Sequence, residues 1–255
     1  MPVPDLRAPA ILWELPDMLV CWKPGGMATA PLRRNMEGTL LEWVGHRFPE
    51  VLHIPGRSPG EGGLAHRLDT ATSGLVVIAR SPEALQRLLD IASAGGFRKE
   101  YVARCTERTT QGGPPDLDQE WPFLGCLREH RQTRSVTTAF RPYGPGRRRV
   151  APVVTQANHN QPYTSDILSL EPRGAQYPQE YIAHVALTRG FRHQVRVHLA
   201  AMGLPIDGDL LYGGVERKSL QLLAAAVVIT DPHGADNPQE YRIEPVTVEA
   251  FLDFS

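Results

Sequence analysis

The sequence predicts an α+β fold with a mixed, largely antiparallel sheet and flanking helices. Runs with strand character outnumber helical patterns, and the two do not alternate regularly as they would in a doubly wound parallel sheet. The 255 residues, 42% of them hydrophobic, suffice to build one domain with a substantial core. We find no internal repeat and no linker. We therefore expect a single domain over residues 1–255, in one piece or as two halves around a cleft.

The strand candidates are short, β-branched or alternating apolar runs bounded by Gly, Pro, Asn, Asp or Ser. The most apolar of them, LVVIA at residues 75–79, reads as a buried strand. The full set of strand candidates is residues 11–13, 18–22, 64–68, 74–79, 99–105, 135–140, 181–187, 222–230 and 241–254.

Three segments have apolar residues at helical spacing. The clearest helix start is Ser81-Pro82, with a serine as N-cap and a proline at the first helical position. The last of the three helices stops at Gly203, because glycine accepts the left-handed conformation that ends many helices. The helix candidates are residues 39–48, 82–93 and 192–202.

Composition excludes several classes of protein. No apolar run approaches the ~20 residues that cross a bilayer, and the N-terminus lacks the basic start and apolar core of a secretory signal. The three cysteines and nine histidines form no CxxC pair and no metal-ligand spacing. We therefore expect a cytoplasmic protein with reduced thiols, no metal and no membrane partner.

Positive charge is local, although the formal net charge is only −1. Between Leu127 and Val150 there are seven arginines and one acid, Glu129. This cluster is either a phosphate-binding face or a solvated loop, in a stretch, residues 142–160, that we expect to be irregular. The arginines are Arg128, Arg131, Arg134, Arg141, Arg147, Arg148 and Arg149.

A single carboxylate, Asp69, lies between two apolar runs in HRLDTATSG (residues 66–74). Burying a carboxylate costs several kcal/mol unless it is paired and hydrogen-bonded. A nearby arginine would keep the acid ionised, as a nucleophile or base requires. The alternative is a turn in which Asp, Thr and Ser cap backbone amides. The residues themselves leave both interpretations open.

A second segment combines basic and apolar residues, in LTRGFRHQVRVHLAAMGLPIDGDLLYG (residues 187–213). Arg192 and Arg196 are four apart, so the predicted helix places both on one face. They could serve a buried acid or phosphate groups, or they could form an exposed basic face.

Five motifs in order resemble the RluA-type RNA pseudouridine synthases. HRLDTATSG resembles the HRLDxxTSG signature of that family. The other four are KPGGM at Lys23, RKEYVA at Arg98, HQVRVHLAAMGLPIDGD from His193 to Asp209, and LYGG at Leu211. Together they extend from about residue 17 to residue 230. The chain is identified as a member of this family, which implies the pseudouridine synthase fold with a central catalytic cleft.

The resemblance implies isomerisation of uridine to pseudouridine in RNA without a cofactor. Asp69 is the implied catalytic carboxylate, and the sequence does not choose among attack at C1′, assistance of glycal formation and addition at C6. Arg196 is the implied partner of Asp69. Tyr101 is implied to stack on the extruded uracil, which is worth ~1–3 kcal/mol, and to move a proton at C5.

Further residues match the motifs around these three. Arg67 resembles the residue that enters the space left by the flipped base, and His66 is expected to order the loop. Asp209 is expected to hold its own loop and is a weaker second candidate for an active-site acid. The implied substrate-binding residues are His66, Arg67, Thr72, Lys99, Arg192, His193 and Gln194. The implied contacts to the RNA backbone are Arg128, Arg131, Arg134, Arg147, Arg148 and Arg149.

The chain departs from the family pattern in three places, one of them at residues 220–224 (LQLLA), where the usual His-Ala pair is missing and no role carries over. Gly190-Phe191-Arg192 has its arginine one position later than the usual Gly-Arg-x. Residues 109–180 match poorly and read as a divergent, arginine-rich insertion. We also expect no N-terminal S4 domain, which favours a small stem-loop of tRNA or rRNA as the substrate, bound by a monomer. The alternative function is that of a catalytically impaired RNA-binding relative.

Overall fold

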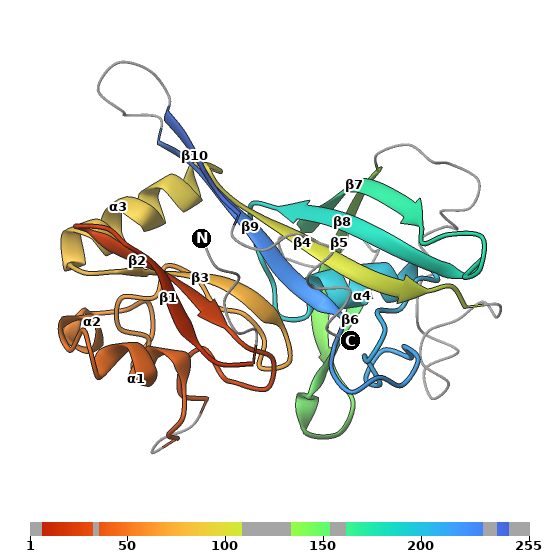
Figure 1. Ribbon diagram of the computed structural model, residues 1–255, viewed down its shortest axis with the longest axis horizontal. Helices are drawn as coiled ribbons and strands as arrows, with labels where there is room; N and C mark the ends of the chain where they lie inside the picture. Colours follow the sequence, from red (N-terminus) through yellow and green to blue (C-terminus); the bar gives the residue numbers. More distant parts are fainter. Residues whose placement is uncertain (1–6, 33–35, 109–133, 154–161, 232–238, 245–255) are drawn as a thin grey trace. The chain divides into compact units, whose positions relative to one another are not determined.

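The computed structural model of the protein divides into two compact units (Figure 1). It describes residues 7–32, 36–108, 134–153, 162–231 and 239–244. Unit 1 comprises Met1–Lys99 and Leu223–Phe251, and unit 2 comprises Glu100–Leu222 and Leu252–Ser255.

The sheet of unit 1 is mainly antiparallel, with strand order β1-β2-β3-β9 and β10 paired to β9. Among the pairings of the described strands in this unit, that of β3 with β9 is parallel, through Ser73 with Leu223 and Gly74 with Ala224. Gly74 adopts φ 130°, and a Cβ there would collide with the backbone of Ala224. The strands are β1 (Ala10–Glu14), β2 (Met18–Lys23), β3 (Ser73–Ala79), β9 (Leu222–Asp231) and β10 (Gln239–Ile243).

Three helices accompany these strands: α1 (Leu40–Gly45), α2 (Glu50–His53) and α3 (Pro82–Ser93). Ser81 is the N-cap of α3, and its hydroxyl accepts the Ala84 N–H at 3.1 Å. One face of α3 buries its apolar side chains in a core with β2, β3 and β9. Burial of these side chains stabilises the unit by about 25 cal/mol for each Å² of apolar surface.

Unit 2 contains a second antiparallel arrangement, in the strand order β8-β7-β5-β6. Strand β4 (Phe97–Thr106) begins in unit 1, and from Glu100 onward it belongs to unit 2. Helix α4 (Gln194–Ala201) is buried along its whole length, and Val197 and Ala200 pack with Phe140, Val150 and Tyr212. The other elements are β5 (Arg134–Tyr143), the short 3-10 helix η2 (Pro145–Arg147), β6 (Arg149–Val153), β7 (Tyr163–Pro172) and β8 (Glu180–Leu187).

The predicted α+β class with a mixed, mostly antiparallel sheet is confirmed. Three local predictions are wrong. Residues 64–68 are not a strand, since only Leu64 makes an isolated bridge, to Ile78. Residues 142–160 are not irregular throughout, because they contain β6. Helix α4 begins at Gln194 after a left-handed His193. Arg192 therefore precedes the helix and does not share a helical face with Arg196.

Candidate active site

Asp69 is half-buried, at the start of a turn that leads into β3. The Thr72 N–H donates to the Asp69 carbonyl at 3.0 Å, and the Gly26 N–H donates to the Thr70 carbonyl at 2.8 Å. Leu68, immediately before, is 7% exposed. The two interpretations of this segment are thus compatible: the backbone forms a turn, and the turn carries a partly desolvated carboxylate.

Lys23, at the end of β2, binds the backbone of this turn. Its side chain is fully buried, and Nζ donates to the carbonyls of Met27 at 2.7 Å, Pro24 at 3.0 Å and Thr70 at 3.2 Å. Burial lowers the pKa of Lys23 to about 7, while the Asp69 carboxylate acts to raise it. The lysine therefore links the KPGGM segment to the backbone next to Asp69 and lies close enough to the carboxylate for the two charges to interact.

Thr29 holds the chain on the other side of Asp69. Its hydroxyl donates to the Leu68 carbonyl at 2.8 Å and accepts the Leu68 N–H at 3.1 Å. Leu68 and Thr29 are both buried. Lys23 and Thr29 thus fix the backbone directly before and after the carboxylate.

His66 is a neutral, buried part of the same segment. Its Nε2 accepts the Val77 N–H at 3.2 Å, and its ring lies 5.3 Å from that of Phe97. Burial, together with Lys99 and Arg57, lowers the pKa of His66 to about 3. The pKa of the buried Lys99 falls to about 8, first through burial and then through Arg57. These contacts support the loop-ordering role expected for His66.

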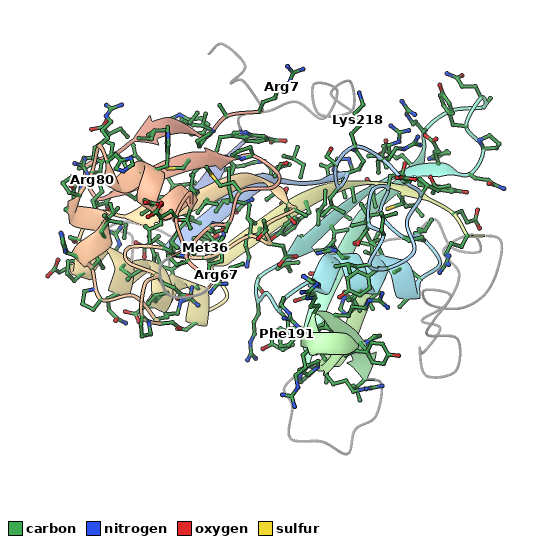
Figure 2. The ribbon with its side chains drawn as sticks, turned by 90° about the horizontal axis from the view of Figure 1, so that it is seen from below. Arg7, Met36, Arg67, Arg80, Phe191 and Lys218 are labelled. Carbon is green, nitrogen blue, oxygen red and sulfur yellow. The ribbon has the colours of Figure 1, made fainter. Side chains whose placement is uncertain are left out.

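Arg67 is exposed at the surface of unit 1 (Figure 2). Its Nη1 lies 2.7 Å from Glu61 Oε1. Ion pairs at such exposed positions are worth ~0–1 kcal/mol, so Arg67 can leave Glu61 at little cost. That property suits a side chain expected to enter an RNA helix.

In unit 2, Arg196 and Asp209 form a buried, two-pronged ion pair. Arg196 Nε and Nη2 donate to the two carboxylate oxygens, both at 2.7 Å, and the side chains are 5% and 1% exposed. The guanidinium also lies over the ring of Tyr212, 5.2 Å from its centroid. Asp209 therefore orients Arg196, a role the sequence did not suggest. Arg196 and Asp69 belong to different units, and their expected pairing stays a prediction. The action of the buried Tyr101 in β4 also stays a prediction.

His193 and Gln194 fix the start of α4 by internal contacts. His193 has φ 59°, and its Nδ1 lies 2.8 Å from the Tyr212 hydroxyl. Gln194 donates to the Thr164 carbonyl at 2.8 Å and accepts the Phe191 N–H at 2.9 Å. Direct binding of substrate by His193 and Gln194, and by Thr72 and Lys99, stays a prediction.

Arg192 holds the turn between β5 and β6, which we call the arginine turn (residues 144–149). Its Nη2 donates to the carbonyls of Arg147 at 2.8 Å and Arg149 at 3.2 Å. Arg147 and Arg148 are exposed and Arg149 is half-buried. Arg134 begins β5, whereas Arg128 and Arg131 lie outside the described residues.

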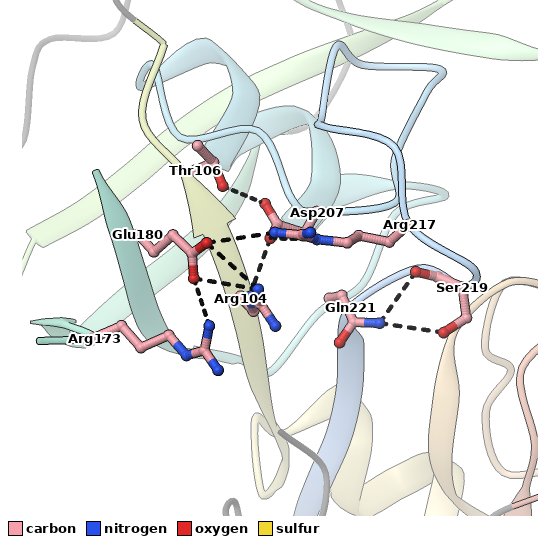
Figure 3. A network of polar contacts seen from close by, with 8 residues as sticks. All are labelled: Arg104, Thr106, Arg173, Glu180, Asp207, Arg217, Ser219 and Gln221. Atoms are coloured by element: carbon pink, nitrogen blue, oxygen red, sulfur yellow. Dashed lines mark hydrogen bonds and ion pairs between the residues drawn. The ribbon is translucent and has the colours of Figure 1, made fainter. Parts of the chain in front are cut away.

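A network of charged side chains secures the loop that carries Asp209 (Figure 3). Asp207 is fully buried; its carboxylate accepts from the Thr106 hydroxyl at 2.7 Å and lies 3.1 Å from Arg104 Nε and 3.3 Å from Arg217 Nη2. Glu180 Oε2 lies 3.2 Å from Arg104 Nη2. Burial raises the pKa of Asp207 although both arginines oppose that change. Among the described residues, no three His, Cys, Asp or Glu side chains cluster to hold a metal ion.

A protein-family model described as RNA pseudouridylate synthase matches residues 17–201. The chain belongs to this family. The matched range includes the Lys23 and Asp69 segments of unit 1, and Tyr101 and Arg196 of unit 2. The predicted family is therefore confirmed, while the roles of individual residues are a separate question.

Curated relatives with similar sequences include three ribosomal large subunit pseudouridine synthases D. That of Yersinia pestis is 30% identical over 209 residues, covering 81% of this chain and 53% of the relative. Those of Vibrio parahaemolyticus and Escherichia coli strain K12 are each 29% identical over 210 residues, with the same coverage. The chain thus spans about half the length of the curated relatives it matches.

Solved structures agree on the fold. Human RNA pseudouridylate synthase domain containing 1 superposes with a TM-score of 0.65 at 21% identity, covering 97% of this chain and 86% of that one. Human RNA pseudouridylate synthase domain containing 4 gives 0.59 at 16% identity, covering 95% and 90%.

Lys23 and Thr29 are the site residues that the sequence reasoning missed. The KPGGM motif is part of the family pattern, but the pattern by itself gives no role to its lysine. A signal existed, because a lysine at the end of the apolar run MLVCW must be buried or turn outward. What it contacts could not be read from the sequence, since Thr70 is 47 residues away.

Proposed function

We propose that this chain isomerises uridine in RNA to pseudouridine, with Asp69 as the catalytic carboxylate. The observation that carries the proposal is the half-buried Asp69 turn, fixed by Lys23 and Thr29, within a chain of the pseudouridylate synthase family. A rigid turn with a carboxylate beside a buried lysine suits a group that must be ionised and aimed at one atom of a bound nucleotide.

The reaction rearranges bonds without an external reactant. The C1′–N1 bond breaks, the uracil turns, and C5 bonds to C1′. The C5 proton then leaves to solvent and N1 gains a proton, so that product and substrate have the same composition. Asp69 assists the first step, Tyr101 supports the base and the loss of the C5 proton, and Arg196 stabilises the ionised Asp69. The target uridine must leave its helical stack first, and Arg67 takes the vacated space.

The substrate we propose is a stem-loop of large-subunit ribosomal RNA. The relatives from Yersinia pestis and Vibrio parahaemolyticus are named ribosomal large subunit pseudouridine synthase D. A tRNA stem-loop presents similar chemistry and is the second substrate to test. We further propose that the protein acts in the cytoplasm as a monomer and that residues 1–255 form one catalytic domain. None of the described helices is long and apolar enough to cross a membrane.

Release of tritium tests the reaction. Ribosomal RNA and tRNA labelled with tritium at uridine C5 are incubated separately with the wild type and with Asp69→Asn. We expect the wild type to release tritium from one RNA class and Asp69→Asn to release none. RNA binding without release from either class by the wild type would instead support an RNA-binding relative that lacks catalysis.

A further inference from the structure

The surface around Phe191 in unit 2 combines aromatic rings with arginines. Phe191 stacks on the buried Phe140, with ring centroids 4.9 Å apart and planes at 7°. Tyr163 lies against the Phe191 ring at 5.1 Å and 56°, and the Arg189 guanidinium lies 4.7 Å from the Tyr163 ring centroid. Phe191 is half-buried and Arg189 is exposed. The aromatic group is thus backed by the core on one side and borders solvent on the other.

Phe191 is held in place by its neighbours. Its N–H donates to the Gln194 side chain at 2.9 Å, and the next residue, Arg192, donates to the carbonyls of Arg147 and Arg149. Figure 2 shows Phe191 beside the strands of the β5–β6 hairpin. Ring and arginine turn are therefore both fixed before any ligand arrives, which lowers the entropic cost of binding.

Two of the three segments that contribute to this cluster are rich in arginine, while the third, β7, carries Asp166, which accepts a hydrogen bond from the Ser135 hydroxyl. Residues 134–153 and 187–206 together contain eight arginines and no aspartate or glutamate. Of these, Arg147, Arg148, Arg189 and Arg192 are exposed, whereas Arg196 is paired inside with Asp209. Exposed guanidinium groups beside a fixed aromatic ring are complementary to an unpaired nucleotide, which offers a flat base and an anionic phosphate.

We propose that Phe191, Arg189, Arg192 and the arginine turn form a subsite for an unpaired nucleotide of the RNA other than the reacting uridine. Its base stacks on Phe191, and its phosphates contact the exposed arginines. The subsite rests on the proposed function only in assuming that the ligand is RNA. It also explains the departure at Gly190-Phe191-Arg192: the arginine moves to the hairpin, and an aromatic ring takes the preceding position.

The test compares binding of two RNAs, a hairpin with an unpaired loop and a blunt duplex made from its stem. The variants are Phe191→Leu, which keeps an apolar side chain on Phe140, and Phe191→Trp, which keeps an aromatic face. We expect Phe191→Leu to weaken hairpin binding about 5- to 160-fold, the range for loss of one base stack, and to leave duplex binding unchanged. Phe191→Trp should restore hairpin binding.

The matched control is Tyr177→Ala. Tyr177 is also exposed in unit 2, with the Arg173 guanidinium 4.5 Å from its ring centroid, but it lies outside the Phe191 cluster. Its loss should not change hairpin binding. Arg148→Ala should reduce the salt dependence of hairpin binding by about 0.7 in the log–log slope, whereas Phe191→Leu should leave that slope unchanged.

Three outcomes would overturn the subsite. Phe191→Leu could bind the hairpin as tightly as the wild type does, or it could lose hairpin and duplex binding equally. The third outcome is that the wild type does not bind the hairpin. Scanning single abasic positions through the loop identifies the stacked nucleotide, because Phe191→Leu should have no further effect on that RNA. Tritium release by the wild type decides the proposed function separately. If the wild type releases tritium and Phe191→Leu binds the hairpin normally, the subsite is wrong and the proposed function still holds.

Discussion

Asp69 in unit 1 and Asp209 in unit 2 lie in motifs of similar prominence, yet the fold treats their carboxylates differently. Asp209 is 1% exposed, and both of its oxygens are held by Arg196 at 2.7 Å. Asp69 is half-buried on a turn whose backbone is held by Lys23 and Thr29. A carboxylate held by both oxygens in a buried pair orients its partner. For Asp69, the half-buried position on a fixed turn fits the catalytic role proposed above.

The same contrast extends to the cations. Lys23 satisfies its buried ammonium with backbone carbonyls, and burial lowers its pKa to about 7. Arg196 satisfies its guanidinium with a carboxylate. Removing one partner of a buried ion pair leaves an uncompensated charge, which is the most destabilising change expected in either unit.

The largest expected effect is that of Arg196→Met. It leaves Asp209 buried without its partner, so the free energy of unfolding should fall by ~3–5 kcal/mol. The double variant Arg196→Met/Asp209→Leu removes both charges and should recover most of that loss. Urea unfolding measures both. Comparable stability of Arg196→Met and the wild type would show that the pair does not organise unit 2.

Acid should destabilise the protein through its buried histidines. Burial lowers the pKa of His66 and His193 to about 3 and that of His198 to about 4. These values lie below the ordinary 6.5, so the unfolded chain takes up protons first. Their contribution is therefore present above pH 6.5 and is lost as the pH falls towards 4. For His198, which is fully buried, the loss between pH 7 and pH 5 is about 2 kcal/mol.

His198→Gln tests that assignment whatever its stability at pH 7. The difference in unfolding free energy between pH 7 and pH 5 should shrink by most of the amount assigned to His198. His46→Gln, at an exposed position, should leave it unchanged. An unaltered pH dependence in His198→Gln would mean that burial does not lower the pKa of this imidazole in the folded protein.

Lys23 should produce a smaller change of the same sign above neutral pH. Its folded pKa of about 7 lies below the ordinary 10.5, so the unfolded chain binds more protons and the free energy of unfolding rises with pH. Between pH 7 and pH 8 the rise amounts to about 1 kcal/mol. Lys23→Met should abolish it. Lys99→Met should remove much less over this interval, because the pKa of Lys99 is about 8. If the unfolding free energy of Lys23→Met still rises by the full amount between pH 7 and pH 8, another group causes the rise.

The smallest effect on stability is expected for Arg67→Ala, below ~0.5 kcal/mol, because its pair with Glu61 is exposed. Its activity should fall on the order of tenfold with a uridine in a helical stem, because flipping that base costs a few kcal/mol. With a uridine in an unpaired strand it should match the wild type. Equal losses on both RNAs would place Arg67 in general RNA binding rather than in base flipping.

The sequence was sufficient for features that depend on neighbouring residues. Ser81-Pro82 predicted the start of α3, and the β-branched run at residues 75–79 predicted β3. The polar run after Asp69 allowed a turn as one of two interpretations. These signals act within a few residues, so they are visible without a fold.

Features that depend on distant partners were missed. Strand β7 was missed because a polar residue lies on its buried face. Ser165 is fully buried, and its hydroxyl bonds to His198 and Gln194. The serine therefore interrupts the alternation of apolar residues that indicates a strand. Asp209 could not be assigned to Arg196, since that pairing depends on how α4 and the following loop fold back on each other. The carbonyl contacts of Lys23 also needed the tertiary structure. Each miss concerns a polar group whose partner lies in another element.

The most direct test of the division between the two aspartates measures tritium release and urea unfolding in parallel for Asp69→Asn and Asp209→Asn. We predict that Asp69→Asn unfolds within about 1 kcal/mol of the wild type and releases no tritium. Asp209→Asn should be clearly less stable and, below its unfolding temperature, still release tritium at a reduced rate. Release by Asp69→Asn, or its absence in an Asp209→Asn protein of wild-type stability, would contradict the account.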